Sequence, residues 1–168
     1  LAGTPGAVAA KAGNPAEVFG RAARTIEADY AVPYLTHAAM EPLNCTIEYV
    51  PGASCVIHSG SQMPTADQAA AAAILGLQPA QVTINTMIAG GSFGRRATQD
   101  ADLVSEAAQI AKALNGKAPV KLMWTREDDI QGGYYRPMYL HRLKAGLDKD
   151  GHIVAWQHRI VGQSIMTG

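Results

Sequence analysis

A glycine-rich stretch near the middle of the chain, Gly90–Arg96, constrains the fold more than any other feature. It follows the β-branched run Val82–Ile88 and precedes Thr98–Leu114, where apolar residues recur at helical spacing. A strand, a glycine loop and a helix in this order direct backbone N–H groups and a helix N-terminus towards an anionic or oxo-bearing ligand. The alternative is a strained turn that binds nothing. The stretch has neither the Gly-Lys-Ser/Thr of a P-loop nor the G-x-G-x-x-G of a dinucleotide fold.

Composition describes a globular protein and excludes several classes of partner. The chain has 168 residues, of which 48% are hydrophobic and 17% charged, so it forms one domain or part of a larger one. Lys plus Arg and Asp plus Glu number 14 each, so no excess of basic charge indicates nucleic-acid binding. The longest apolar run, Ala69–Leu75, is far too short to cross a bilayer.

The two ends of the sequence are interpreted as cuts in a longer subunit. The chain begins at Leu1, without a basic segment followed by an apolar one, and it stops at Gly168 just after a predicted strand. The two cysteines, Cys45 and Cys55, are expected on the arms of a hairpin turning at Pro51-Gly52. A two-residue turn there would place Glu48 opposite Cys55, so we expect two free, buried thiols and no disulfide.

Local patterns predict an α+β fold, a two-layer sandwich in which two to three helices pack on one side of a mixed sheet with hairpins. Strands are expected at 24–32, 43–50, 53–58, 82–88, 119–124, 139–147 and 152–163. Helices are expected at 15–23, at 66–75 with Thr65 as N-cap and Gly76 as terminator, and at 98–114 with Thr98 as N-cap. Thr125–Asp128 predicts a capping box that opens one helical turn. We assign 1–23 as a lead-in with a short helix and 24–168 as part of a single domain.

Three stretches, in order, match one family pattern: Tyr34–Thr46, Gly90–Arg96, and Trp124–Asp129 with Tyr135–Pro137. Together they resemble the molybdopterin-binding large subunit of the xanthine oxidase/aldehyde oxidase family. The most similar branch is that of the isoquinoline 1-oxidoreductase β-subunit, which includes membrane-associated bacterial aldehyde dehydrogenases. The resemblance covers residues 24–168.

This resemblance implies part of a molybdenum hydroxylase. Such enzymes carry Mo on molybdopterin, often as the cytosine dinucleotide, and insert a water-derived oxygen into a C–H bond of an aldehyde or a heteroaromatic substrate. Electrons leave through [2Fe–2S] clusters on a small partner subunit, and then often through a cytochrome c subunit. The implied partners also include the rest of the same large subunit, and the implied location is the periplasm or cell envelope. No cofactor is expected to bind this segment alone, and no activity is expected from it.

The resemblance assigns the cofactor contacts to the glycine-rich loop. In the family this loop lies against the molybdenum centre, with main-chain N–H groups near an oxo ligand, and we carry that role to Gly90, Gly91, Ser92, Phe93, Gly94, Arg95 and Arg96. Two interpretations of Arg95 and Arg96 remain open: the side chains contact a pterin phosphate, or they are solvated beside the start of a helix.

Several positions depart from the xanthine-type pattern. Ser92 replaces a third glycine, which would be strained if the position needs a positive φ, or would add a hydroxyl donor if it does not. Leu35 replaces a glutamine near the oxo ligand, and Ala97 replaces a substrate-orienting glutamate, so purine substrates are disfavoured. The family's catalytic glutamate lies much nearer the C-terminus of the full subunit, so no catalytic residue is expected in this chain.

Other residues carry competing interpretations. We expect Glu41 to be a structural carboxylate that accepts backbone N–H groups, and Glu127–Asp129 to be capping residues on a solvated surface. Tyr134–Arg136 could line a substrate funnel or plug the core. The five histidines lack metal-ligand spacing, so no protein-ligated metal is expected. Two other functions remain open: a non-catalytic interaction domain of the same fold, and a nucleotide- or phosphate-binding module.

Overall fold

The structure, a computed structural model, describes residues 3–164 and divides into two compact units. One unit comprises Leu1–Leu35 and Arg136–Gly168, and the other comprises Thr36–Tyr135. Each is described by itself below. The unit boundaries fall within β2 (Leu35–Thr36) and β7 (Tyr135–Arg136), which pair as a two-stranded sheet. The assignment of 24–168 to one family domain stays a prediction.

The Thr36–Tyr135 unit is built on a mixed four-stranded sheet of order β5-β4-β3-β6. Its strands are β3 (Asn44–Val50), β4 (Ser54–Ser59), β5 (Val82–Thr86) and β6 (Val120–Met123). β4 pairs antiparallel with β3 and parallel with β5, and β6 runs antiparallel to β3 on its other side. The parallel pairing needs a crossover, which α2 (Pro64–Leu75) and the short 3-10 helix η1 (Pro79–Gln81) supply.

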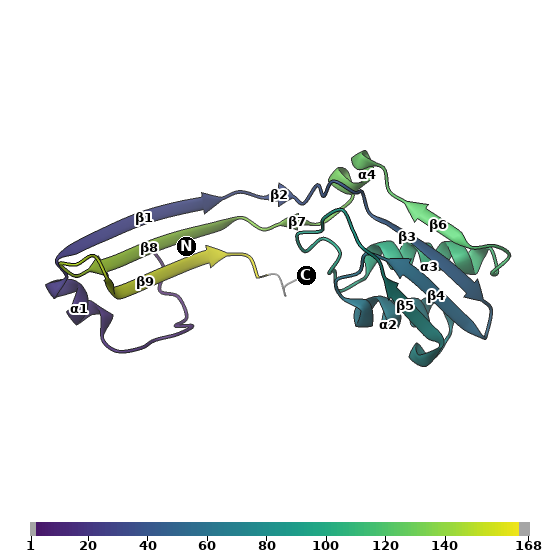
Figure 1. Ribbon diagram of the computed structural model, residues 1–168, viewed down its shortest axis with the longest axis horizontal. Helices are drawn as coiled ribbons and strands as arrows, with labels where there is room; N and C mark the ends of the chain where they lie inside the picture. The colour runs from purple at the N-terminus through teal and green to yellow at the C-terminus, as the bar shows by residue number, and fades with distance from the viewer. Residues whose placement is uncertain (1–2, 165–168) are drawn as a thin grey trace. The chain divides into compact units, whose positions relative to one another are not determined.

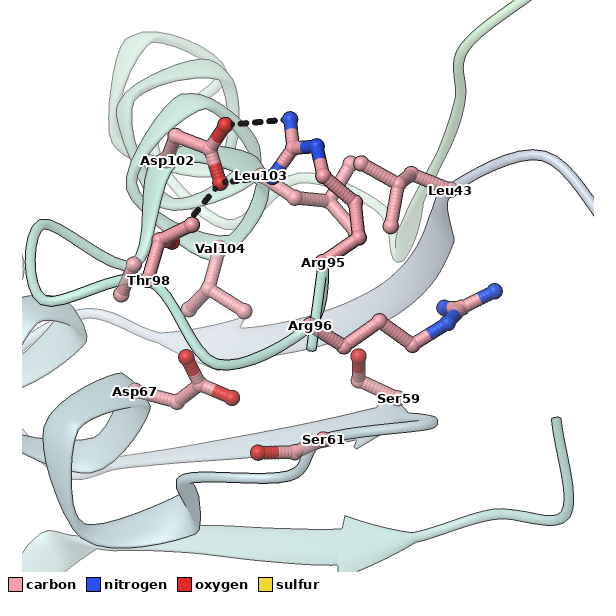
Figure 2. A pocket seen from close by; sticks show the side chains of 11 residues that line it. Leu43, Ser59, Ser61, Asp67, Arg95, Arg96, Thr98, Asp102, Leu103 and Val104 are labelled. Atoms are coloured by element: carbon pink, nitrogen blue, oxygen red, sulfur yellow. Dashed lines mark hydrogen bonds and ion pairs between the residues drawn. The ribbon is translucent and has the colours of Figure 1, made fainter. Parts of the chain in front are cut away.

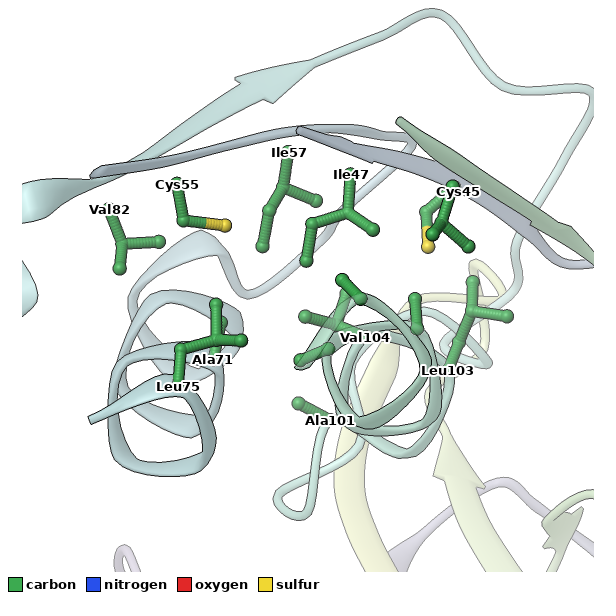
Figure 3. Packing of buried hydrophobic residues seen from close by; sticks show 14 of the residues in the cluster. Cys45, Ile47, Cys55, Ile57, Ala71, Leu75, Val82, Ala101, Leu103 and Val104 are labelled. Carbon is green, nitrogen blue, oxygen red and sulfur yellow. The ribbon is translucent and has the colours of Figure 1, made fainter. Parts of the chain in front are cut away.

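The core lies between one face of this sheet and two helices. Figure 3 shows α2 and α3 (Asp102–Ala113) side by side beneath the strands, with Ile47 and Ile57 pointing down between them. Both isoleucines are fully buried, and alanines such as Ala71 and Ala107 let the helices approach the sheet closely. This arrangement confirms the predicted two-layer α+β fold.

The cysteines lie in this core, and the predicted absence of a disulfide is confirmed. Cys45 and Cys55 are free and buried, and burial raises their thiol pKa values to about 12 and about 11. The expected register was wrong by one residue, because Tyr49, not Glu48, pairs with Cys55. The turn contains one residue more than expected: Val50 pairs with Ser54, and Ala53 N–H donates to the Val50 carbonyl.

The predicted helix starts were less accurate than the predicted ends. Gly76 terminates α2 in the left-handed conformation, as expected. Helix α2 begins at Pro64, so Met63 and not Thr65 is its N-cap, and Asp102, four residues after Thr98, begins α3. The capping box at Thr125 is confirmed, with its hydroxyl accepting from Asp128 N–H at the start of α4 (Arg126–Gln131).

The other unit contains a three-stranded antiparallel sheet of order β1-β8-β9 (Figure 1). Its elements are α1 (Pro15–Arg21), β1 (Arg24–Val32), β8 (Tyr139–Leu147) and β9 (Ile153–Gly162). The predicted hairpin between β8 and β9 is confirmed. Asp148 closes its turn by accepting the N–H groups of Asp150 and His152. β1 was expected to be half-buried, but Ile26 and Tyr30 on its apolar face are 43% and 56% exposed.

Within residues 3–164, no helix is both long enough and apolar enough to span a membrane.

Candidate functional site

The glycine-rich loop connects β5 to α3 through a series of tight turns. Arg95 N–H donates to the Ser92 carbonyl and Ala97 N–H to the Gly94 carbonyl, each at 3.0 Å. Gly91, Phe93 and Gly94 have φ values of +97°, +57° and +101°. A positive φ in a bulky residue such as Phe93 is uncommon and marks a strained backbone held by its surroundings. The predicted helix N-terminus does not directly follow the loop, because α3 begins later.

Glu41 anchors the start of the loop. Its carboxylate accepts Gly90 N–H at 2.5 Å and the Asn44 side-chain amide at 2.6 Å, and Glu41 N–H donates back to the Gly90 carbonyl. The Gly90 N–H, then the Asn44 amide, and the charges of Arg96 and Lys121 hold the pKa of Glu41 below its ordinary value of 4.5. Glycine is required at position 90, because a Cβ there would lie 2.7 Å from the Glu41 Cβ. The expected structural role of Glu41 is confirmed.

The Ser92 side chain stabilises the turn through two hydrogen bonds. Its φ is not positive, so it carries none of the strain that its replacement of a glycine suggested. The hydroxyl accepts Arg96 N–H at 3.1 Å and donates to the Gln62 side-chain carbonyl at 2.5 Å. Ser92 therefore adds a donor, and it fixes the loop to the segment after β4.

Arg95 is buried beneath the loop. It is 3% exposed, and its two terminal nitrogens donate to the Asp102 carboxylate at 3.2 and 2.6 Å. The guanidinium carbon also lies 5.2 Å from the Trp124 ring and 5.6 Å from the Tyr134 ring, within the range of cation–π attraction. Thr98, the expected helix cap, instead donates its hydroxyl to Asp102. The solvated-surface interpretation of Arg95 is therefore wrong.

Arg96 is also buried, and it lies beside a small cavity lined by both polar and apolar side chains (Figure 2). A terminal nitrogen lies 3.6 Å from the Glu41 carboxylate and 3.5 Å from its carbonyl oxygen. The cavity of about 20 Å³ is lined in part by Ser59, Ser61 and Asp67, and it has room for about one water molecule. Burial raises the pKa of Asp67. The buried Nε atoms of Arg95 and Arg96 have no hydrogen-bond partner among the described residues.

A third arginine ties the first motif to the third. Arg126, at the start of α4, donates to the carbonyls of Ala39 and Met40 at 2.5 and 3.0 Å and pairs with Asp129 at 2.9 Å. Asp129 is 4% exposed, so its expected place on a solvated surface was wrong. The structure thus brings all three motifs together around the loop.

The outer side of the loop offers unpaired main-chain donors. Across the described part of the chain, no hydrogen bond uses the N–H groups of Gly91, Ser92, Phe93 or Gly94. The Phe93 side chain is 77% exposed, and Met40, Met87 and Ile88 are also exposed. Successive backbone N–H groups in a turn conformation can form a concave site for anions or oxo groups. The loop can therefore bind such a group through its main chain.

Tyr134 and Tyr135 make structural contacts. Tyr134 donates its hydroxyl to Asp100 at 2.6 Å, and its carbonyl lies 3.2 Å from His37 Nδ1. Tyr135 donates to the Ile130 carbonyl at 2.5 Å. Both side chains remain about half exposed, so each holds its own loop in place while keeping one ring face accessible.

One cluster of potential metal ligands lies far from the loop in sequence. Asp148, Asp150 and His152 in the β8–β9 turn place ligand atoms within 4.8 Å of one another. Asp148 already accepts two backbone N–H groups of that turn. Asp150 and His152 are exposed, which is ordinary for turn residues.

Sequence reasoning missed three residues that support the loop: Gln62, Asp102 and Trp124 as a partner of Arg95. The last two could not be assigned locally, because their contacts depend on where α3 begins and where β6 ends. An acid seven residues after Arg95 was the only available signal for Asp102.

Comparison with known proteins identifies relatives along almost the whole chain. The sequence profile of the family described as "Molybdopterin cofactor-binding domain" matches residues 2–165. Isoquinoline 1-oxidoreductase subunit beta of Brevundimonas diminuta is 38% identical over 128 residues, covering 76% of this chain and 16% of the relative. Membrane-bound aldehyde dehydrogenase [pyrroloquinoline-quinone] of Gluconacetobacter polyoxogenes is 30% identical over 143 residues, covering 85% of this chain and 18% of the relative.

A solved structure shows the same fold. Aldehyde oxidoreductase from Desulfovibrio gigas superposes with a TM-score of 0.67 at 25% identity, covering 90% of this chain and 16% of that one. The chain thus spans less than a fifth of the length of each of these three proteins.

The Glu41 carboxylate gives the loop a testable dependence on pH. Because its pKa is lowered on folding, the stabilisation it provides is present above pH 4.5 and is lost as the pH falls through the folded pKa. We expect Glu41→Gln to reduce hydrogen-exchange protection of the Gly90 amide several-fold at pH 6.5, since a charge-assisted bond is lost. NMR-detected exchange should show this difference narrow below pH 4.5. Glu127→Gln is the control, and an equal effect there would contradict the assignment.

The buried Arg95–Asp102 pair predicts a large loss of stability. Arg95→Ala should lower the free energy of unfolding by about 3 kcal/mol, because it leaves a carboxylate that is 22% exposed without its partner. The matched control is Arg142→Ala, which breaks a half-exposed pair with Asp29 and should cost much less, since exposed ion pairs contribute little to stability. Urea titration followed by circular dichroism measures both. Similar losses for the two variants would refute a structural role for Arg95.

Proposed function

This chain belongs to the family of molybdopterin cofactor-binding domains, and from that premise we propose that it forms part of the cofactor-binding subunit of a molybdenum hydroxylase. Relatives in the family are molybdenum-dependent oxidoreductases of the aldehyde oxidoreductase and xanthine dehydrogenase type. The observation that carries the proposal is the row of unpaired N–H groups at Gly91, Ser92, Phe93 and Gly94 on an accessible loop.

The loop fits a molybdopterin centre on chemical grounds. Four adjacent N–H donors suit an oxo or phosphate oxygen, and glycine at positions 91 and 94 permits the positive φ values of this turn. The supports at Glu41, Ser92 and Arg95 hold these donors in place before anything binds, which is how main-chain donors stabilise charge effectively. In this proposal Gly90–Gly94 contact the cofactor. Arg95 and Arg96 do not contact it but stabilise the loop, since their guanidinium groups pair with Asp102 and Glu41.

When bound, the cofactor would supply the oxidation itself: insertion of a water-derived oxygen into a C–H bond, with electrons passed to [2Fe–2S] clusters on a small partner subunit. Phe93 would exclude water from one side of the reacting group, because its ring projects from the loop. Residues of this chain would bind and orient the cofactor and would not act as the catalytic base. The cytosine dinucleotide form and a cytochrome c partner are part of the same proposal.

The substrate class is proposed from the two departures in the motifs. Leu35 and Ala97 stand where the xanthine-type pattern places a glutamine and a glutamate. A pocket without these polar groups favours aldehydes or N-heterocycles over purines, since a purine's polar edge would be left unpaired. The names of two relatives, isoquinoline 1-oxidoreductase and aldehyde dehydrogenase, fit these substrates. A periplasmic or cell-envelope location is proposed with the same branch.

Metal and pterin content test the proposal. The complete reading frame, expressed in a host that makes molybdopterin, should carry about one Mo per polypeptide by mass spectrometry. Gly91→Val should reduce Mo and pterin to below about a tenth, because its φ of +97° excludes a branched residue. Gly52→Val is the matched control, since Gly52 has a φ of +71° in a β-turn and should lose stability without losing Mo.

A second result would favour the alternative, a non-catalytic interaction domain of the same fold. A complete protein that copurifies with an iron–sulfur subunit but contains no Mo would support that reading. A loss of Mo in Gly52→Val equal to that in Gly91→Val would remove the loop from the proposed site.

The 168-residue chain alone should be inactive. It spans 16–18% of the length of the two curated relatives, and the base that the family requires is expected outside it. Assays with an aldehyde or isoquinoline and a dye acceptor should give no turnover above a protein-free blank, even after incubation with molybdopterin. Sustained turnover by the purified chain would contradict this.

A further inference from the structure

The β1-β8-β9 sheet has one apolar face that no helix of its unit covers (Figure 1). Residues paired across the strands share a face, so Ile26, Ala145 and Trp156 form one row, and Tyr30, His141 and Ile160 form another. Ile26, Tyr30, Trp156 and Ile160 are 43%, 56%, 52% and 54% exposed. We call this surface the open face.

The opposite face carries two ion pairs and the only helix described in this unit, α1. Lys144 pairs with Glu27 at 2.8 Å, and Arg142 pairs with Asp29 at 2.8 Å. Helix α1 packs over one end of it, where the Phe19 ring lies under the Lys144 ammonium group. The large exposed residues Ile26, Trp156 and Ile160 therefore lie on the side without a helix, while the opposite face also carries the apolar row Ala31, Leu140 and Val161.

An apolar sheet face of this size needs a second layer. Three strands of nine or ten residues cover on the order of 400 Å² at ordinary strand spacing, which is the size of patch that marks an interaction site. A sheet becomes stable when one face packs on another element. The open face therefore has the composition of a surface that packs against another element, not of one that faces solvent.

We propose that the open face is the docking surface for another part of the same subunit. The family profile spans residues 2–165, so all three strands lie within the matched family domain. In the two curated relatives the matched segment is only 16% and 18% of the polypeptide, so most of each chain lies outside it. The inference rests on the proposed function only in taking this segment as part of a longer subunit.

The chemistry of the open face indicates an apolar occupant. His141 Nδ1 lies 2.9 Å from His158 Nε2, so these two ring atoms satisfy each other without an outside partner. The rest of the two rows is aliphatic or aromatic, apart from the Tyr30 hydroxyl and the Trp156 indole N–H. The part of the subunit that packs on the open face is therefore a sheet or helix layer with aliphatic and aromatic side chains, and it needs no charged group.

The test compares the complete protein with the 168-residue chain. The open-face variant is Trp156→Gln with Ile160→Thr, and the matched control is Glu27→Gln with Gln157→Thr, from one row of the opposite face. In the complete protein the open-face variant should lower the Tm by about 5 °C or more. In the 168-residue chain it should change the Tm by less than about 1 °C and reduce binding of an apolar dye by half. The control should do neither.

A footprinting measurement keeps the test valid if the open-face variant fails to fold. Hydroxyl-radical oxidation of Trp156 in the wild-type complete protein should be at least tenfold slower than in urea. A rate within twofold of the unfolded rate would overturn the proposal, as would a complete protein that tolerates the open-face variant. So would a reading frame that adds nothing to these 168 residues, or a dimeric 168-residue chain that this variant converts to monomers.

These readouts do not involve molybdenum. A complete protein with Mo and a tolerated open-face variant would refute only this inference, and one without Mo whose open-face variant is destabilised would refute only the proposed function.

Discussion

Two consecutive arginines buried beneath the glycine-rich loop are the constraint on which the rest of the site depends. A buried guanidinium destabilises a fold unless its charge and N–H groups are met, so Arg95 and Arg96 dictate what must surround them. Arg95 pairs with Asp102 at the start of α3 and contacts the rings of Trp124, from the third motif, and Tyr134, which directly precedes Tyr135 of that motif. Arg96 pairs with Glu41 from the first motif, and the Glu41 carboxylate accepts a hydrogen bond from Gly90 N–H. The loop is thereby fixed to three distant segments at once.

The same constraint explains which parts of the fold were predictable from the sequence. Strands and hairpins follow local alternation and turn residues, so β1, β8, β9 and the Gly76 helix stop were recovered. The start of α3 was not, because Thr98 gives up capping to bind Asp102, a choice set by the tertiary contact with Arg95. Burial was equally non-local: β1 alternates like a half-buried strand, but its unit supplies no second layer.

For the site, the sequence located the loop through its glycines and family motifs but did not reveal its conformation. Nothing local indicated that Phe93 would adopt a positive φ while Ser92 would not. The reason lies in the neighbours: Gln62 and the Arg96 N–H fix the Ser92 hydroxyl, which leaves the next residue to complete the turn. Motif resemblance assigned one role to all of Gly90–Arg96, whereas the geometry divides the stretch into an outer row of free N–H groups and an inner pair of anchoring cations.

The two units therefore differ in what they need from outside. The Thr36–Tyr135 unit closes its own core, since Ile47, Ile57 and the alanines of α2 and α3 pack without help. Its strained loop can be held ready because that core and the ion pairs offset the strain at Phe93, which is of order 1–3 kcal/mol. The β1-β8-β9 sheet buries little and leaves its aromatic residues exposed. A loop that is held by buried ion pairs, next in sequence to a sheet with an exposed apolar face, agrees with the proposed place of this segment in a larger subunit.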